Sequence, residues 1–168
     1  MDKRKTLSAS FLLLIAACLC LPTVKADNAQ PTLPIVELVI GETPLTTEIA
    51  SNGEQRYMGL SFRTTLAENA GMLFVYPKER MLAFTMRNTL LPLSIAYISD
   101  DLVINEILDM NVGPDQLFYS TKPAKFALEV NQGWFSRNGY QGWRSNSHAL
   151  VRLMVDQCGS MVAVSQTG

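Results

Sequence analysis

Residues 81–98 read MLAFTMRNTLLPLSIAYI, two apolar segments separated by Arg87, Asn88 and Thr89 and by a proline. The flanking segments, 81–86 and 93–98, have the length and composition of buried strands. Arginine and asparagine are costly to bury without partners. The polar insert between these two strands is therefore either a structural clasp or part of a functional site.

Outward from this stretch, short apolar segments alternate with turn signals such as Gly113-Pro114 and Lys122-Pro123. One short helix is predicted over residues 52–58, with Ser51 and Glu54 as its capping box and Gly59 as its stop. This rhythm predicts a mainly β fold, a compact β-sandwich or barrel-like domain with one or two short helices. Besides 81–86 and 93–98, the expected strands cover residues 35–40, 45–50, 72–76, 102–108, 125–131, 150–155 and 161–164.

The N-terminus has the order of a secretory signal peptide, a basic start, an apolar run over residues 11–21 and small residues near Ala26. The apolar run is too short for a membrane span. We expect a signal peptide over residues 1–26, a flexible leader over 27–34 and one domain over 35–168. The protein is then exported, to the periplasm or beyond the cell. Residues 15–18, IAAC, also match a lipobox, and the alternative is an envelope lipoprotein anchored at Cys18.

Removal of residues 1–26 takes away four basic residues and one acidic residue, so the net charge changes from −1 to −4. No basic cluster remains, which argues against a nucleic-acid partner. Of the three cysteines only Cys158 remains, so no internal disulfide is expected.

The mature chain lacks the residue sets of several common active sites. His148 is its one histidine, in a polar loop, and with Cys158 it does not make a zinc ligand set, so no metal is predicted. No nucleophile elbow and no phosphate-binding glycine loop occurs, and no cofactor is predicted. The sequence therefore favours binding over catalysis.

Polar residues placed among the predicted strands are the candidate ligand-binding groups. Along residues 125–131, Phe126, Leu128 and Val130 alternate with polar positions, so Glu129 and Asn131 are expected to face outward or into a cleft. Trp134 begins a glycine-rich aromatic loop and is expected to be exposed. The full candidate set is Arg56, Arg63, Arg87, Asn88, Thr89, Glu129, Asn131 and Trp134.

Five spaced blocks resemble the signatures of the domain-of-unknown-function 192 (DUF192) family. They appear in the family's order at residues 55–63, 71–75, 84–89, 92–98 and 128–133. The resemblance implies a compact, mainly β domain, often exported by bacteria, with no established activity. It carries over Arg56, Gly59, Arg63, Met86, Asn88, Thr89, Pro92, Glu129 and Gly133. Three positions depart from the family pattern: Thr85 replaces a tryptophan, Ser94 replaces an acidic residue, and Trp143 stands where an aspartate follows the closing glycine.

The preferred hypothesis is a non-enzymatic domain that binds a small polar ligand, a glycan or a peptide in a cleft lined by Arg56, Arg87, Asn88, Glu129 and Trp134. One alternative is a hydrolase or lyase with Glu129 as general acid or base, which predicts an arginine within about 5 Å of Glu129 in an open pocket, together with a perturbed pKa. A second alternative is an envelope assembly or interaction module, which predicts an uncovered apolar patch. The oligomeric state and the role of residues 144–168 stay open.

Overall fold

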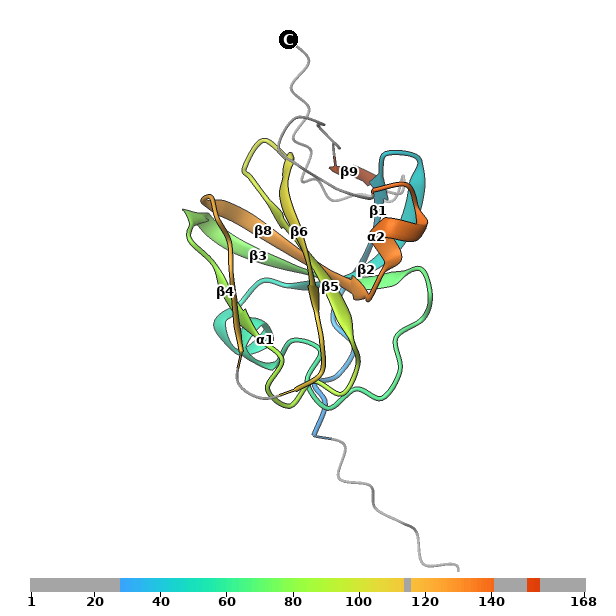
Figure 1. Ribbon diagram of the computed structural model, residues 1–168, viewed down its shortest axis with the longest axis vertical. Coiled ribbons are helices and arrows are strands. Elements are labelled where there is room, and N and C mark those ends of the chain that lie inside the picture. The colour runs from blue at the N-terminus through green and yellow to red at the C-terminus, as the bar shows by residue number, and fades with distance from the viewer. Residues whose placement is uncertain (1–27, 114–115, 141–150, 155–168) are drawn as a thin grey trace, which may run out of the picture.

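The computed structural model describes residues 28–113, 116–140 and 151–154 (Figure 1). Within this part of the chain it contains nine strands and two short helices. They are β1 (Ile35–Ile40), β2 (Thr43–Ala50), α1 (Gly53–Met58), β3 (Ala70–Arg80), β4 (Ala83–Thr85), β5 (Leu93–Ile98), β6 (Ile104–Met110), β7 (Leu117–Tyr119), β8 (Ala124–Asn131), α2 (Trp134–Arg137) and β9 (Val151–Met154).

The main sheet has the strand order β6-β5-β8-β3-β2-β1, with β9 added along β1, and β4 and β7 form a separate small sheet. β2 and β3 are parallel, and the other pairs in the main sheet are antiparallel. The two outer strands β6 and β9 do not pair as strands among the described residues, although the Val151 N–H donates to the Leu102 carbonyl at 3.1 Å. The prediction of a mainly β fold is confirmed, and the sheet is not a closed barrel.

Each face of the main sheet carries its own apolar cluster. The first cluster includes Leu38, Leu73 and Leu128, and it is covered by Trp134 and Phe135 of α2. The second, on the opposite face, includes Met72, Phe74, Ile95 and Tyr97 of the sheet, and it is covered by Leu60 after α1 and by Leu82, Phe84 and Met86 around β4. Because both faces are covered, β5 is buried along its whole length, and β3 and β8 are buried in their central parts.

Helix α1 covers Gly53–Met58, within the predicted range, but its capping box lies one residue later than expected. Asn52 is the N-cap: its Oδ1 accepts from the Gln55 N–H at 2.9 Å, and Gln55 Oε1 accepts from the Asn52 N–H at 3.2 Å. The prediction of Ser51 and Glu54 as the pair is wrong, because asparagine and glutamine one position on satisfy the same spacing. Gly59 ends the helix as predicted, with φ of 50°.

Two other elements differ from the prediction. Strand β3 continues past Pro77 to Arg80, with an irregular register against β8 between Val75 and Arg80, since proline cannot donate to the ladder. Residues 134–137, expected as loop, form α2 after Gly133, whose φ of 75° suits glycine. Trp143, His148, Cys158 and the predicted strand 161–164 lie outside the described residues.

Candidate functional site

Glu129 lies in the middle of the main sheet, on the face of the second apolar cluster. It is the register partner of Met72 on β3 and of Ile95 on β5. Of the two orientations expected for Glu129, outward or into a cleft, the outward one is wrong: the residue is 5% exposed, because the elements around α1 and β4 cover this face as well. The alternation along β8 was read correctly, but it does not reveal that both faces of the strand are covered.

The Glu129 carboxyl has no hydrogen-bond or ion-pair partner among the described residues. The residue as a whole is 5% exposed. Burial raises the pKa of Glu129 to about 8. The carboxyl is therefore mostly protonated at neutral pH.

Two tyrosines near Glu129 respond to its charge. Burial raises the pKa of Tyr76 on β3 and of Tyr97 on β5, and a charged Glu129 adds to both shifts. The Tyr97 hydroxyl donates to the Phe118 carbonyl at 2.7 Å, so its proton is already used. Neither tyrosine hydrogen-bonds Glu129 in this structure.

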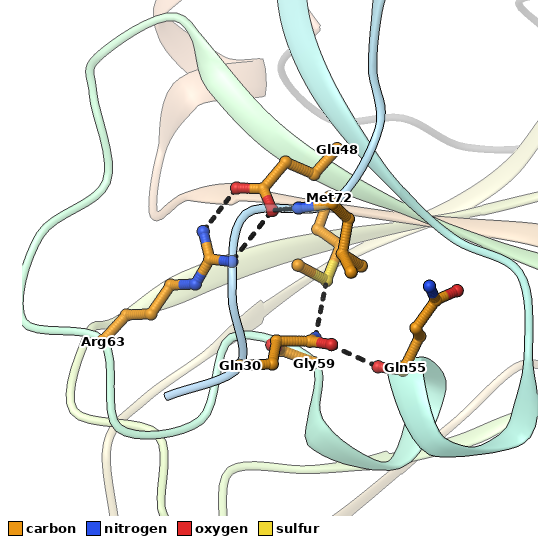
Figure 2. A network of polar contacts seen from close by, with 7 residues as sticks. Gln30, Glu48, Gln55, Gly59, Arg63 and Met72 are labelled. Carbon is orange, nitrogen blue, oxygen red and sulfur yellow. Dashed lines mark hydrogen bonds and ion pairs between the residues drawn. The ribbon is translucent and has the colours of Figure 1, made fainter. Parts of the chain in front are cut away.

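Arg63 is held in an ion pair at the same face of the sheet, as Figure 2 shows. Its guanidinium donates two hydrogen bonds to the Glu48 carboxylate, one of them at 2.9 Å, and Glu48 also accepts from the Leu33 N–H at 2.7 Å. The side chains of Arg63 and Glu48 are 15% and 13% exposed. Burial raises the pKa of Glu48, but the bonds from Arg63 and Leu33 outweigh burial and leave the pKa below its usual value.

The expected leader is tied to the domain through this region. The side-chain amide of Gln30 donates to the carbonyls of Gln55 and Gly59, at 3.1 and 2.7 Å, and approaches the sulfur of Met72 (Figure 2). The Gln55 carbonyl also accepts from the Gly59 N–H at 2.9 Å, so Gln30 adds a second bond to it and joins the N-terminal segment to the end of α1. The description of residues 27–34 as a flexible leader did not anticipate these contacts.

Arg56 acts as a backbone clasp at the start of α1. Its guanidinium donates to the carbonyls of Ser51 and Val75, the latter at 2.9 Å, and lies over the ring of Tyr76 at 4.8 Å from the centroid. The arginine thereby joins the end of β2 to β3. Its donors face backbone oxygens and not Glu129.

The polar insert of the opening stretch is a turn whose side chains differ in exposure. Arg87 and Asn88 are exposed, and Thr89 is buried with its N–H donated to the Met86 carbonyl at 3.0 Å. The Asn88 carbonyl accepts from the Phe62 N–H at 2.8 Å, which joins this turn to the loop after α1.

Asn131 and Trp134 have structural roles. The Asn131 side chain donates to the carbonyls of Leu66 and Ala67, at 3.2 and 2.8 Å, and so holds that loop against β8. Trp134 is fully buried on the opposite face and donates from its indole N–H to Asn69 Oδ1 at 3.1 Å. The prediction of an exposed Trp134 in the cleft is wrong, since α2 turns its ring into the first cluster.

The structure thus gathers part of the predicted set. Five of the predicted residues belong to the face of the second cluster or to the loops that cover it: Arg56, Arg63, Thr89, Glu129 and Asn131. Two more, Arg87 and Asn88, project from one of these loops. Trp134 lies on the other face of the sheet. Sequence reasoning missed Glu48. Its signal was limited to the strand pattern, since Glu48 follows the same alternation as Ala50.

The enzyme alternative expected an arginine beside Glu129 in an open pocket. The perturbed pKa is present, but no arginine whose side chain the structure describes pairs with Glu129, and burial is the cause of the shift. Among residues 28–113, 116–140 and 151–154, no group of three or more His, Cys, Asp or Glu side chains could hold a metal ion.

The interaction-module alternative expected an uncovered apolar patch. Three large apolar side chains near β7 are each about half exposed: Leu117 and Tyr119 on its outward face, and Met81 nearby.

Ser94 shows how the chain accommodates its departure from the family pattern. Its hydroxyl accepts from the Gly133 N–H at 2.9 Å and donates to the carboxylate of Asp109, its partner on β6. An acidic residue at position 94 could accept from Gly133 directly. Here the neighbouring strand supplies the carboxylate.

Comparison with known proteins gives one family and several similar solved structures, of which two are described. The model of the DUF192 family, described as "Uncharacterized ACR", matches residues 36–142. A protein from Sinorhizobium meliloti 1021, provisionally described as a transcription regulator, is 27% identical with a TM-score of 0.63, over 74% of this chain and 97% of its own. A protein of unknown function from Novosphingobium aromaticivorans DSM 12444 is 27% identical with a TM-score of 0.61, over 76% of this chain and 95% of its own.

A search of curated proteins found no significant match to the sequence. Among the described helices, neither has the length and hydropathy needed to cross a bilayer.

Proposed function

This chain belongs to the DUF192 family, whose function is not established, and we propose that it is an exported domain that binds a small polar ligand through Glu129 without catalysis. The observation that carries the proposal is the carboxyl of a buried glutamate that has no hydrogen-bond or ion-pair partner among the described residues. Export rests on the signal-like residues 1–26, and a lipid anchor at Cys18 is the alternative.

An unpaired buried carboxyl destabilises a fold. Leaving such a group unsatisfied costs on the order of 1–3 kcal/mol, and an apolar residue of similar volume avoids that cost. The neighbours Met72 and Ile95 show that this position accepts apolar side chains on either side. A glutamate kept here is therefore best explained by use, because stability alone favours its replacement.

The cover over Glu129 supports binding over a purely structural role. It consists of the six-residue helix α1, the loop after it and the segment around β4, which belongs to the small sheet and not to the main one. Short helices and loops open more easily than the central strands beneath them. The ligand enters as the cover shifts, and Glu129 fixes its orientation by hydrogen bonding.

A ligand screen by thermal unfolding tests this function. We expect at least one class among sugars, short peptides, carboxylates and amines to raise the melting temperature of the mature chain. The shift should be lost in Glu129→Met and kept in Glu37→Gln, a change at an exposed glutamate on β1. Shifts that persist in Glu129→Met, or no shift with any class, would refute the proposed function.

A further inference from the structure

Building on the proposed function, we infer that the Glu129 site takes a small primary ammonium compound with a short apolar body. The ligand supplies the positive partner that the chain itself does not. The inference rests on three observations: Arg56 and Arg63 are already bound, a neighbouring glutamate shows what an internal partner does, and the strand residues directly beside Glu129 are apolar.

The arginines near this face have no donors directed at Glu129. Both Nη atoms of Arg63 donate to Glu48. Arg56 donates to two backbone carbonyls and lies over the ring of Tyr76. Redirecting either side chain to Glu129 would leave Glu48 or buried backbone carbonyls without partners, which is costly. The chain therefore has no described cation ready to neutralise Glu129.

Glu48 is the matched comparison for Glu129. Both are register partners of Met72, one on β2 and the other on β8, and both lie on the same face of the sheet. Glu48 has Arg63, and its pKa is lowered in spite of burial. Glu129 has no such partner, and its pKa is raised. A bound cation would do for Glu129 what Arg63 does for Glu48.

The groups that face Glu129 favour a cation over an anion. From β3 these are Met72 and Tyr76, from β5 Ile95 and Tyr97, and beyond Met72 the neutralised pair of Glu48 and Arg63. Arg80, further along β3, acts on Tyr76 but has no effect on the pKa of Glu129. No described cation therefore lies beside the Glu129 carboxyl to hold an anion there. A small ammonium ion would find one carboxylate, while its alkyl part packs on Met72 and Ile95.

Because the free carboxyl is mostly protonated at pH 7, binding an ammonium ion must expel its proton. The Glu129 carboxyl loses H⁺ to the buffer, and the resulting carboxylate pairs with the ligand R–NH₃⁺. The affinity should then rise about tenfold per pH unit from pH 6 to 7 and become constant above about pH 8. A neutral ligand that needs the protonated carboxyl shows the reverse, with constant affinity at low pH and a loss above pH 8.

Calorimetric titration of the mature chain with methylammonium and n-butylammonium chloride tests the inference, with methanol and 1-butanol as neutral counterparts. We expect n-butylammonium to bind more tightly than 1-butanol. Titrations in buffers of different ionisation enthalpy should show release of nearly one proton per ligand at pH 7. Glu129→Gln should abolish ammonium binding and Glu37→Gln should preserve it, with both variants shown to be folded by circular dichroism.

Two results overturn the inference in distinguishable ways. Glu129-dependent binding of the alcohols, equal to or tighter than that of the ammonium ions, removes the cation and leaves the proposed function standing. Binding of neither set to the wild-type chain, or ammonium binding that survives Glu129→Gln, overturns the inference. In that case the ligand screen, with Glu129→Met, decides separately whether Glu129 binds another class.

Discussion

The backbone N–H of Phe62 donates a 2.8 Å hydrogen bond to the carbonyl oxygen of Asn88, and both residues have positive φ, 63° and 60°. Left-handed backbone is rare outside glycine and especially costly for a bulky residue such as phenylalanine. Two strained residues from separate loops thus support each other directly above the second cluster, beside Leu60 and Met86. Strain that is maintained in this way is common at binding sites.

Asn88 should tolerate glycine and reject a β-branched residue. Asn88→Gly should change the free energy of unfolding by less than about 1 kcal/mol, whereas Asn88→Val should lower it by about 2 kcal/mol, because valine is strained at this φ. Urea unfolding of both variants measures the difference. Equal stability of the two would mean that the left-handed conformation at position 88 is not required.

Glu129→Met should stabilise the protein. The substitution removes an unpaired buried carboxyl and fills the same volume, so the free energy of unfolding should rise by about 1–3 kcal/mol. The same change at the exposed Glu37 should have an effect within about 0.5 kcal/mol. Chemical denaturation at pH 7 compares them, and a destabilised Glu129→Met would reveal a partner for the carboxyl in the native state.

The contribution of Glu129 to stability should fall as pH rises. Its folded pKa is about 8 and its usual value is 4.5, so the folded state holds a proton that the unfolded state has lost between these values. This contribution is complete below about pH 4.5, decreases by roughly 1.4 kcal/mol per pH unit above it, and is lost above about pH 8. The difference in unfolding free energy between wild type and Glu129→Gln isolates it. A difference that is constant from pH 5 to 8 would contradict the raised pKa.

Arg63→Met should destabilise the domain and release the leader. The variant leaves the mostly buried Glu48 carboxylate without its cation, at a cost of about 2–3 kcal/mol after allowance for its partial exposure. Glu48→Gln combined with Arg63→Met should cost less than the sum of the single changes, because both remove one interaction. Limited proteolysis before Leu33 should accelerate in Arg63→Met, and an unchanged cleavage rate would show that the leader is held elsewhere.

Ser94→Asp, which restores an acidic residue of the family pattern, should destabilise this chain. It would place a second carboxylate directly opposite Asp109, and like charges on paired strand residues repel. We expect a loss of more than about 1 kcal/mol, recovered in Ser94→Asp with Asp109→Ser. Thermal unfolding of the single and double variants checks this, and a double variant no more stable than Ser94→Asp would rule out the exchange of roles.

The family signatures and the strand pattern were accessible from the chain alone. Residues 35–40 and 93–98 are strands with the predicted bounds, because apolar runs between turn residues specify local structure directly. The helix over 53–58 followed from a cap and a glycine stop, and only the identity of the capping pair was displaced by one residue. These features depend on neighbours in sequence, which a linear reading contains.

The candidate residues were chosen well as polar positions but poorly as an exposed set. Trp134 and Glu129 were both expected to reach solvent, and each is buried, on opposite faces of the sheet. Exposure depends on which element covers a face. α2 and the segments around α1 and β4 cover the two faces from distant parts of the chain, so alternation along β8 could not supply that information.

The sequence by itself therefore determined the elements, the family and the polar residues worth attention. Only the tertiary structure decided which carboxylate has a partner: it places Arg63 on Glu48 and leaves Glu129, two strands away in the same row, with none. The physical reason is that charge pairing and desolvation are set by distances across the sheet. Arg63 is 15 positions from Glu48 in the chain, and Glu129 is 81 positions from it. No local sequence pattern specifies distances between residues so far apart.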